Sequence, residues 1–393
     1  MRMDMGRILS SLLVARNQKQ AQKLSKLLTA KLLEKSLQLD QNFDLNRVSK
    51  GFIDRVSPDV DPEILRRIVV SFQKAKRAQQ LAASVYQVGN EWLPIYESCM
   101  GEIINTLSNG DLPGLQKIYG NFWRDQCSSG LIGFGHDANQ KYFGKNISEK
   151  DKKTFLADTI HRYNLWMRQL AGQYTASDLA GPDIGNPFGY ELDGIFVRSG
   201  SDYLHYYSVA IARYLKDVCR HKIVMEVGGG FGGMAYYLLR DNLDITYVDF
   251  DLPENMALTA YYLMTAFTDK KILLYGEASL VDVNLNDYAA VIMPNFEIQN
   301  MHKLSSDIAF NSYSLAEMSK ETIEKYIIEI QRISRKYFLH VNHTRNCVVS
   351  ADDFGVNAKL FDLMHRAPAL WNLGRNPNMD EFEYLYKRIE DCV

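Results

Sequence analysis

The stretch Ile223-Val-Met-Glu-Val-Gly-Gly-Gly-Phe-Gly-Gly233 decides the fold. It is an apolar run that contains one acid, Glu226, and leads into five glycines within six positions. A second apolar run, 245–250, leads into Asp251-Leu252-Pro253. Short apolar runs of this kind predict buried strands of a parallel sheet, and such sheets bind ligands beyond the carboxyl ends of their strands. The sequence therefore predicts a ligand site where these two strands end.

Outward from this stretch, apolar strand-like runs alternate with helical patterns from about residue 205. We expect strands at 222–227, 244–250, 272–275, 289–293, 308–310 and 338–341, and helices at 204–219, 233–241, 253–267 and 320–335. This alternation is typical of a doubly wound, Rossmann-like α/β domain, which we assign to residues 181–393.

Residues 1–180 have mainly helical periodicity and form a predicted N-terminal helical domain, for substrate binding or dimerisation. Asp61-Pro62-Glu63 predicts the start of a helix that runs to about residue 88, because Asp is a good N-cap and Pro suits the first turn. Residues 128–145 and 180–200 lack a clean period, so we expect loops there.

Composition excludes several classes of protein. The chain has 393 residues and a formal net charge of −2, which argues against a role on nucleic acid. It has no apolar run long enough to span a membrane, and its five scattered cysteines are typical of a reducing compartment, so we expect a cytoplasmic protein. The first 39 residues form a basic amphipathic stretch, which we expect to pack on the protein itself or on a second subunit of a homodimer. No spacing indicates a metal site.

Two cofactors suit the glycine-rich turn. Gly228-x-Gly230-x-x-Gly233 matches the dinucleotide fingerprint, so an NAD-dependent oxidoreductase remains an alternative. However, the carboxylate of Glu226 would repel the pyrophosphate that a dinucleotide brings to this turn. S-adenosylmethionine carries a sulfonium and an ammonium and no phosphate, so the acid favours it. A turn without a ligand needs fewer glycines, since each costs about 0.5–1 kcal/mol in backbone entropy.

The remaining parts of the cofactor site follow from the same strand ends. We expect Glu226, Gly228, Gly230, Asp251 and Leu252 to bind the cofactor, with Asp251 holding the ribose hydroxyls. Asn295 and Phe296 follow the strand at 289–293 and could bind the adenine edge and face. Asn311 could bond to the substrate or to the amino-acid end of the cofactor.

The segments Glu226–Gly233, Val248–Glu254 and Asn311–Met318 resemble the sugar O-methyltransferase family of bacterial glycan gene clusters. Asn121–Arg124 and Gly185–Pro187 are similar to the helical part of that family, so the resemblance covers about residues 115–345. It implies a class I methyltransferase fold, S-adenosylmethionine as cofactor and a sugar hydroxyl as acceptor. The Asp251-Leu252-Pro253 element also resembles plant small-molecule O-methyltransferases, whose catalytic histidine follows the fourth strand. Here that loop holds Asn311 and no histidine, so the resemblance does not identify a catalytic base in this chain.

Methyl transfer to a hydroxyl benefits from a positioned base, typically by about 10²–10⁴-fold. His343 follows the strand at 338–341 and is the first candidate, and His302 is the second. Glu317 is a third candidate, although Ser314-x-x-Glu317 also fits a capping box at the start of the next helix. We expect His340 to be a core residue.

The sequence thus predicts an S-adenosylmethionine-dependent O-methyltransferase that acts on a sugar of a glycan or of a nucleotide-linked precursor. Three alternatives stay open at this point: a methyltransferase for a polyketide or phenol, an NAD-dependent oxidoreductase, and a non-catalytic module that only binds the cofactor.

Overall fold

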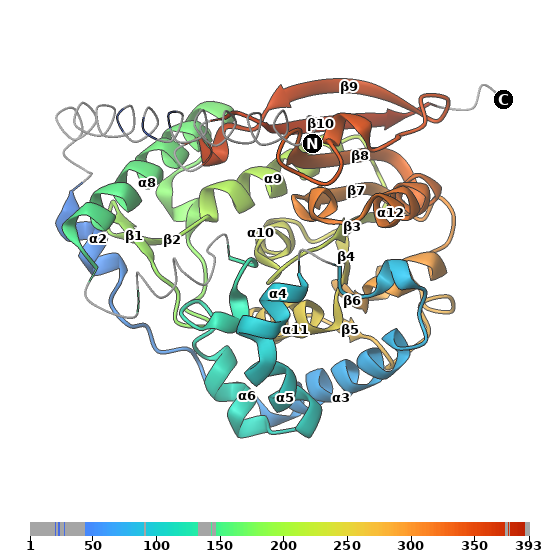
Figure 1. Cartoon of the computed structure of the whole chain (residues 1–393), viewed down its shortest axis with the longest axis horizontal. Helices are drawn as coiled ribbons and strands as arrows, with labels where there is room; N and C mark the ends of the chain where they lie inside the picture. The colour runs from blue at the N-terminus through green and yellow to red at the C-terminus, as the bar shows by residue number, and fades with distance from the viewer. Residues whose placement is uncertain are drawn as a thin grey trace, which may run out of the picture.

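The computed structural model describes residues 44–89, 92–132, 147–373, 376 and 378–389, together with the single positions 20, 23, 27 and 143. Within this part of the chain an eight-stranded sheet has the order β5-β6-β4-β3-β7-β8-β10-β9, which Figure 1 shows from β5 at the bottom to β9 at the top. The strands are β3 (Lys222–Val227), β4 (Ile245–Asp251), β5 (Ile272–Leu274), β6 (Ala290–Pro294), β7 (Ser306–Ser312), β8 (Ser334–His343), β9 (Phe361–Pro368) and β10 (Glu381–Arg388).

The sheet is parallel from β5 to β8, and β10 pairs antiparallel with both β8 and β9. Strands β3 and β7 are neighbours, although the chain builds β4, β5 and β6 between them. The strand order therefore reverses beside β3, and open α/β sheets bind ligands at such a point. The glycine-rich stretch follows β3, so it lies at this reversal. The predicted doubly wound α/β fold is confirmed.

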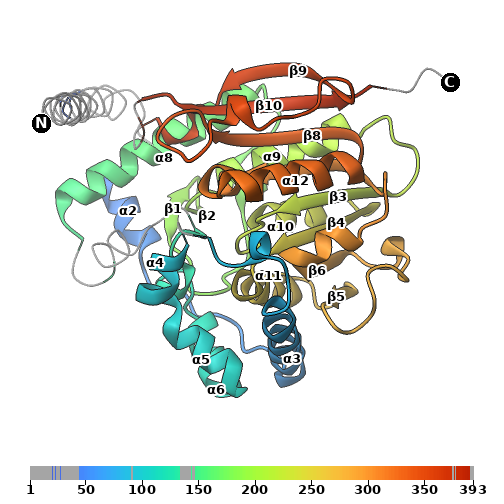
Figure 2. The same ribbon diagram turned by 45° about the vertical axis from the view of Figure 1, so that its right-hand side comes forward.

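Alternation along the strands divides the core between the two faces of the sheet. Val224 and Ile308 belong to one hydrophobic cluster, whereas Met225 and Ala309 belong to the other. The first cluster also contains side chains of α10 (Gly233–Asp241) and α11 (Pro253–Ala266), and the second those of α12 (Lys320–Ile333). Figure 2 shows α12 lying across its face of the sheet. Strands β3, β4, β5 and β6 are almost fully buried and read as nearly continuous apolar runs because both of their faces are covered.

The N-terminal helices are α2 (Leu45–Gly51), α3 (Pro62–Gln79), α4 (Leu93–Ile95), α5 (Gly101–Asn109), α6 (Leu112–Tyr119) and α8 (Glu149–Gln169), and α9 (Ser201–Tyr214) follows them. Of these, α3 packs against α11, α5 and α6 pack against α3, and α2 and α8 pack against each other. Figures 1 and 2 place α3, α5 and α6 below α11. Helix α11 is buried on nearly every side because the sheet covers one face and α3 another. Its carboxylate Glu254 lies 2.6 Å from Nζ of Lys76 on α3.

The predicted start of α3 is confirmed, since Asp61 caps it by accepting a 2.8 Å hydrogen bond from the Glu63 amide. The helix ends at Gln79, earlier than expected. Residues 180–200 are not a loop throughout, because β1 (Gly189–Leu192) and β2 (Ile195–Arg198) form an antiparallel hairpin. Strands β9 and β10 were not predicted. Expectations for residues 1–39 fall almost entirely outside the described residues. No described helix has the length and apolar character needed to cross a membrane.

Candidate functional site

A cavity of about 690 Å³ lies at the carboxyl ends of the parallel strands. Its volume is within the range of small-molecule sites, about 300–1,000 Å³. Glu226, the glycine-rich turn and Asp251 line its centre. Ser84, Val85, Gln87, Val88, Asn255, Asn295 and Tyr326 line one end, and Arg162, Tyr313, His343, Asn372, Asn376 and Glu381 line the other. Glu226, Gly228, Gly230, Asp251 and Leu252, which the sequence predicts at one site, all line this cavity.

The glycine-rich turn forms a concave wall of this cavity. Gly228 and Gly230 have φ angles of 79° and 63°, which side chains rarely adopt. A Cβ at Gly228 would collide with the side chain of Ser314. At Gly230 the nearest atom to such a Cβ would be the Leu131 carbonyl oxygen at 3.4 Å. The side chain of Ser314 therefore covers the backbone at Gly228, whereas the backbone at Gly230 is open to close approach by a ligand.

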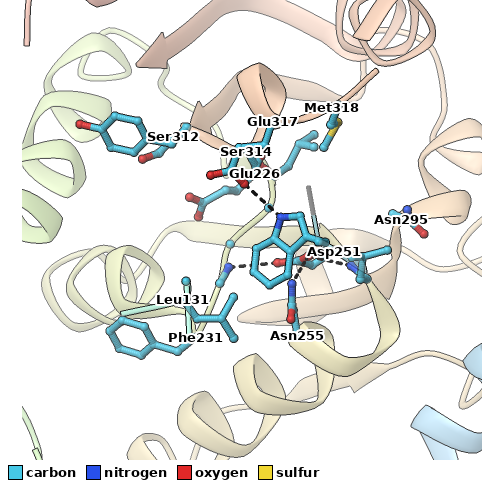
Figure 3. Close-up of a pocket in the computed structure, with 18 of the residues that line it drawn as sticks. Leu131, Glu226, Phe231, Asp251, Asn255, Asn295, Ser312, Ser314, Glu317 and Met318 are labelled. Atoms are coloured by element: carbon cyan, nitrogen blue, oxygen red, sulfur yellow. Dashed lines mark hydrogen bonds between the residues drawn. The ribbon is translucent and has the colours of Figure 1, made fainter. Parts of the chain in front are cut away.

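Asp251 anchors the turn from the end of β4. Oδ2 accepts a 3.1 Å hydrogen bond from the Gly230 amide, and Oδ1 accepts bonds of 2.7 Å from the Leu252 amide and 2.9 Å from Asn255. Figure 3 shows Asp251 above Asn255, with Glu226 higher in the cavity. A carboxylate offers about four acceptor positions, so one is left for a ligand hydroxyl. Burial raises the pKa of Asp251 to about 6, although its three hydrogen bonds oppose the rise.

Glu226 is the second acid of the cavity, and only 4% of it is exposed. Tyr247 donates a 2.7 Å hydrogen bond to its Oε2 atom. Burial raises the pKa of Glu226 to about 8, and the charge of Asp251 adds to this, while the Tyr247 bond opposes it. A ligand cation next to Glu226 would stabilise the ionised form, whereas a ligand anion there would favour the protonated form.

The two residues proposed for the adenine ring have different positions. Asn295 lines the cavity and donates a 3.1 Å hydrogen bond to the Tyr86 carbonyl. Phe296 does not line it, because its ring points into the core, where it packs edge-on against Tyr275 with centroids 5.7 Å apart. The short helix that begins at Asn295 turns these successive side chains in different directions.

Asn311 and His302 are also outside the cavity lining, contrary to expectation. Asn311 is fully buried, and its Nδ2 donates to the Val227 carbonyl at 2.8 Å and to Ser314 at 2.6 Å. It therefore braces β7 against β3 and has no access to a ligand. The ring of His302 bonds through Nε2 to the Val281 carbonyl at 2.9 Å, on the surface.

His343 and Glu317 both line the cavity. Nδ1 of His343 lies 3.8 Å from Oδ1 of the buried Asp380, so Nε2 is left for other partners. Oε2 of Glu317 accepts a 3.0 Å hydrogen bond from the Trp92 indole. The expected capping box is absent, because Ser314 donates to the Val227 carbonyl and α12 is capped by Ser319 instead. His340 is a core residue as expected, and burial lowers its pKa to about 3.

We call the part of the cavity lined by Arg162, Tyr313, His343, Asn372, Asn376 and Glu381 the polar end. Of these residues the sequence analysis predicted only His343. Oε2 of Glu381 accepts hydrogen bonds from Tyr313 at 2.7 Å and Asn372 at 3.0 Å, and Oε1 accepts one from Asn376 at 3.0 Å. Arg162 reaches the same place from α8 and donates to Asn372. These residues are far apart in the sequence and form no motif. The alternation of β10, Glu381-Phe-Glu-Tyr-Leu-Tyr, was the one available signal for a strand there.

Comparison with known proteins adds the following. No protein-family model and no curated protein matches the chain. Solved structures similar in fold include the pyocyanin biosynthetic protein PhzM (10% identity, TM-score 0.33, 62% of this chain and 74% of that one). The mitomycin 7-O-methyltransferase MmcR is similar at 10% identity and TM-score 0.31, over 61% of this chain and 71% of that one. Phosphoethanolamine N-methyltransferase 1 of Haemonchus contortus has 13% identity and TM-score 0.30, over 63% of this chain and about half, 51%, of that one. At these values the likeness does not identify an activity.

Proposed function

We propose that the protein is an S-adenosylmethionine-dependent O-methyltransferase whose acceptor is a sugar hydroxyl. One observation carries the proposal. Glu226 and Asp251 stand at the ends of neighbouring strands in a single cavity that continues to His343. Acids suited to a cationic nucleoside thus lie in the same cavity as a histidine that can accept a proton.

The residues at the centre fit this cofactor. Glu226 suits the ammonium group of its amino-acid part, and the free acceptor position of Asp251 suits one ribose hydroxyl. Asn295 and Tyr326 line the adjoining end, where an adenine ring would follow the ribose. A dinucleotide fits less well, because its pyrophosphate beside Glu226 would oppose the ionisation of this buried acid, which would then offer the ligand no charge attraction. The alternative of an NAD-dependent oxidoreductase is therefore disfavoured.

When bound, the cofactor supplies an electrophilic methyl group. The chain positions the acceptor hydroxyl and removes its proton. With Nδ1 facing Asp380, Nε2 of His343 would receive this proton as the new carbon–oxygen bond replaces the methyl–sulfur bond, which would leave a neutral thioether. Asp380 stabilises the resulting imidazolium and fixes the orientation of the ring, as a carboxylate does for a histidine base elsewhere. Glu317 is bonded to Trp92, and we assign it to shaping the cavity wall.

The polar end supports a hydroxyl-rich acceptor, because Asn372, Asn376 and Glu381 supply amide and carboxylate groups for hydrogen bonds. The resemblance of the glycine-rich and Ser-x-x-Glu-Met segments to sugar O-methyltransferases also favours a sugar acceptor. A phenolic acceptor is the second candidate, since the rings of Trp92, Trp123, Tyr203 and Tyr313 line the same cavity.

Calorimetric titration with S-adenosylmethionine, S-adenosylhomocysteine and NADH tests the cofactor. We expect Kd values on the order of micromolar for the first two, no binding of NADH, and a loss of at least about tenfold in affinity in Asp251→Ala. Asp287→Ala, which removes an acid away from the cavity, is the matched control. Binding of NADH without binding of S-adenosylmethionine would overturn the proposal.

A further inference from the structure

Tyr313, in the turn that follows β7, has a backbone conformation that side chains rarely adopt. Its φ is 66° and its ψ is −34°. The left-handed region that residues with side chains do visit has ψ of about +30° to +60°, and a bulky residue with positive φ is an outlier. Among the described residues, seven other than glycine have a positive φ, and of these Tyr313 is the one that lines the cavity. Strained residues of this kind occur mainly at functional sites.

Strand β8 holds this turn at both ends. The Tyr313 amide donates a 2.7 Å hydrogen bond to the Val341 carbonyl. Three residues later, the Ala316 amide donates to Oδ1 of Asn342 at 3.1 Å. A relaxed backbone at Tyr313 would send the chain in another direction, so these bonds together offset its strain. Such a conformation persists only where the surrounding structure fixes it in this way.

The strained backbone places the Tyr313 ring against two other rings of the cavity. It stacks on Tyr203 with centroids 6.1 Å apart and an interplanar angle of 27°, and its centroid lies 5.4 Å from that of His343 at an angle of 43°. At the far end of the ring, the hydroxyl donates to Oε2 of Glu381 at 2.7 Å and accepts from Asn372 at 3.1 Å. The ring is therefore fixed from both ends and presents a fixed surface to His343.

The His343 ring has a use for such a surface. Its Nδ1 atom lies 3.8 Å from Oδ1 of Asp380, which is beyond hydrogen-bond distance, and 31% of the side chain is exposed. The carboxylate attracts an imidazolium at this distance, but it does not lock the neutral ring that has to accept the proton. The χ2 torsion of histidine is broad and roughly two-fold, and a half turn would put a carbon in the place of Nε2.

We propose that Tyr313 is a positioning residue for His343. The strained turn after β7 holds its ring against the imidazole, so that Nε2 stays directed at the acceptor hydroxyl. Tyr313 itself takes up no proton, and its effect on the reaction passes through the histidine. This inference rests on the proposed function and adds a positioning residue to the same site.

Variants that keep or remove the ring test the proposal by turnover. The probes are S-adenosylmethionine and the methyl glycosides of gluco, galacto and manno configuration, and release of S-adenosylhomocysteine measures methyl transfer. Tyr313→Ala should lower kcat by about 10–100-fold and leave the KM of the glycoside within about threefold, because orientation is lost and binding is not. Tyr313→Phe keeps the ring, so its kcat should stay within about threefold of the wild type. A raised KM with unchanged kcat in Tyr313→Ala would indicate direct contact with the acceptor and contradict the proposal.

The same change in a His343→Gln background shows whether the ring acts through the histidine. With no imidazole to orient, Tyr313→Ala should change kcat by less than about twofold. Tyr214→Ala removes a partly buried ring outside the cavity lining and is the matched control, with unchanged kcat expected in both backgrounds. An equal loss of kcat from Tyr313→Ala in both backgrounds would overturn the proposal.

The orientation of the imidazole can also be measured without turnover. In protein labelled with ¹⁵N in the histidine rings and studied by NMR at pH 9, the His343 signals are those lost in His343→Gln. We expect one tautomer in the wild type, with the proton on Nδ1 facing Asp380. In Tyr313→Ala the share of the other tautomer should rise by at least about threefold. An unchanged tautomer ratio would argue against positioning.

Failure of the proposed function is distinguishable from failure of this inference. It would appear as no methyl transfer to any of the three glycosides, or as an unchanged kcat in His343→Gln. The histidine spectrum decides in either case whether Tyr313 orients the ring.

Tyr313→Gly measures the strain and serves as the ring-free variant if Tyr313→Ala does not fold. Glycine adopts a φ of 66° readily, so Tyr313→Gly should unfold at a higher urea concentration than Tyr313→Ala, the reverse of the usual order. Both variants lack the ring, so both should show the same loss of kcat and the same change of tautomer. Binding of S-adenosylhomocysteine checks that each is folded. A Tyr313→Ala variant at least as stable as Tyr313→Gly would contradict the strained turn on which the proposal depends.

Discussion

The phenol of Tyr247 donates a 2.7 Å hydrogen bond to Oε2 of Glu226, and both side chains are buried. This bond favours the ionised carboxylate, but burial dominates and raises the pKa of Glu226 to about 8. At pH 7 the free protein therefore holds Glu226 mainly in the neutral form. A ligand ammonium reverses this preference, so binding of the cofactor is linked to release of a proton.

The first prediction concerns this linkage. Because the ionised form binds the ammonium better, affinity for S-adenosylhomocysteine should rise with pH and level off above about pH 8. Below that pH it should fall by up to about tenfold per unit, which corresponds to one proton released. Titration calorimetry at pH 6, 7, 8 and 9, in buffers with different ionisation enthalpies, measures the affinity and the proton count.

In Glu226→Gln the pH dependence of binding should disappear above about pH 7, where only Glu226 titrates, and the dependence near pH 6 that comes from Asp251 should remain. The affinity at pH 8 should be lower than that of the wild type. Glu321→Gln is the control, because Glu321 lines the same cavity but is exposed to solvent, so its pH profile should match that of the wild type. A wild-type affinity that does not change between pH 6 and 8 would refute the linkage.

The second prediction concerns the base. His343→Gln should lower kcat by about 10²–10⁴-fold and leave the Kd of S-adenosylhomocysteine unchanged, since only proton transfer is lost. Asp380→Asn should lower kcat by a smaller factor, because the imidazolium loses its stabilising charge but the base remains. His302→Gln should have no effect, as this ring lies outside the cavity lining. An unchanged kcat in His343→Gln would eliminate His343 as the base.

The third prediction concerns the anchor between α3 and α11. Glu254 is buried between Nζ of Lys76 at 2.6 Å and the Tyr96 hydroxyl at 2.5 Å. Lys76→Met leaves this carboxylate without a countercharge and should lower the free energy of unfolding by about 1–3 kcal/mol. This is less than for a fully buried pair, because one third of Lys76, 33%, is exposed.

Urea denaturation measures this change in stability. Adding Glu254→Gln to Lys76→Met should recover part of the loss, since the neutral amide needs no countercharge. Lys74→Met is the matched control on the same helix, because its ammonium donates to the exposed Gly276 carbonyl and its loss should cost little. A double variant as unstable as the single variant would argue against an electrostatic origin.

Much of the fold could be predicted because its signals are local. The strand expected at 222–227 is β3, Lys222–Val227, and the helix expected at 233–241 is α10, Gly233–Asp241. Both depend on apolar runs and on turn residues whose conformational preferences act over a few positions. The hairpin of β1 and β2 was missed because its short strands are stabilised by pairing and packing, and their own sequence has little periodicity.

In the candidate site too, the residues that could be predicted are those whose signals are local. Glu226 and Asp251 could be placed because residues at the ends of parallel strands share one edge of the sheet. Phe296 and Asn311 were placed wrongly, because Phe296 lies in the short helix after β6, and Asn311 lies near the end of β7, where Phe310 and Ser312 face the cavity instead. There a rotation of one residue decides whether a side chain faces the cavity or the core.

The sequence by itself determined that the chain folds into a doubly wound sheet, with a glycine-rich turn and two acids at its binding edge. Hydrophobic periodicity and backbone preference are properties of neighbouring residues, so they can be read directly. Only the tertiary structure decided that Arg162 from α8, His343 from β8 and Glu381 from β10 meet at one end of the cavity. Their meeting depends on strand order and packing between distant segments, and no local preference encodes it.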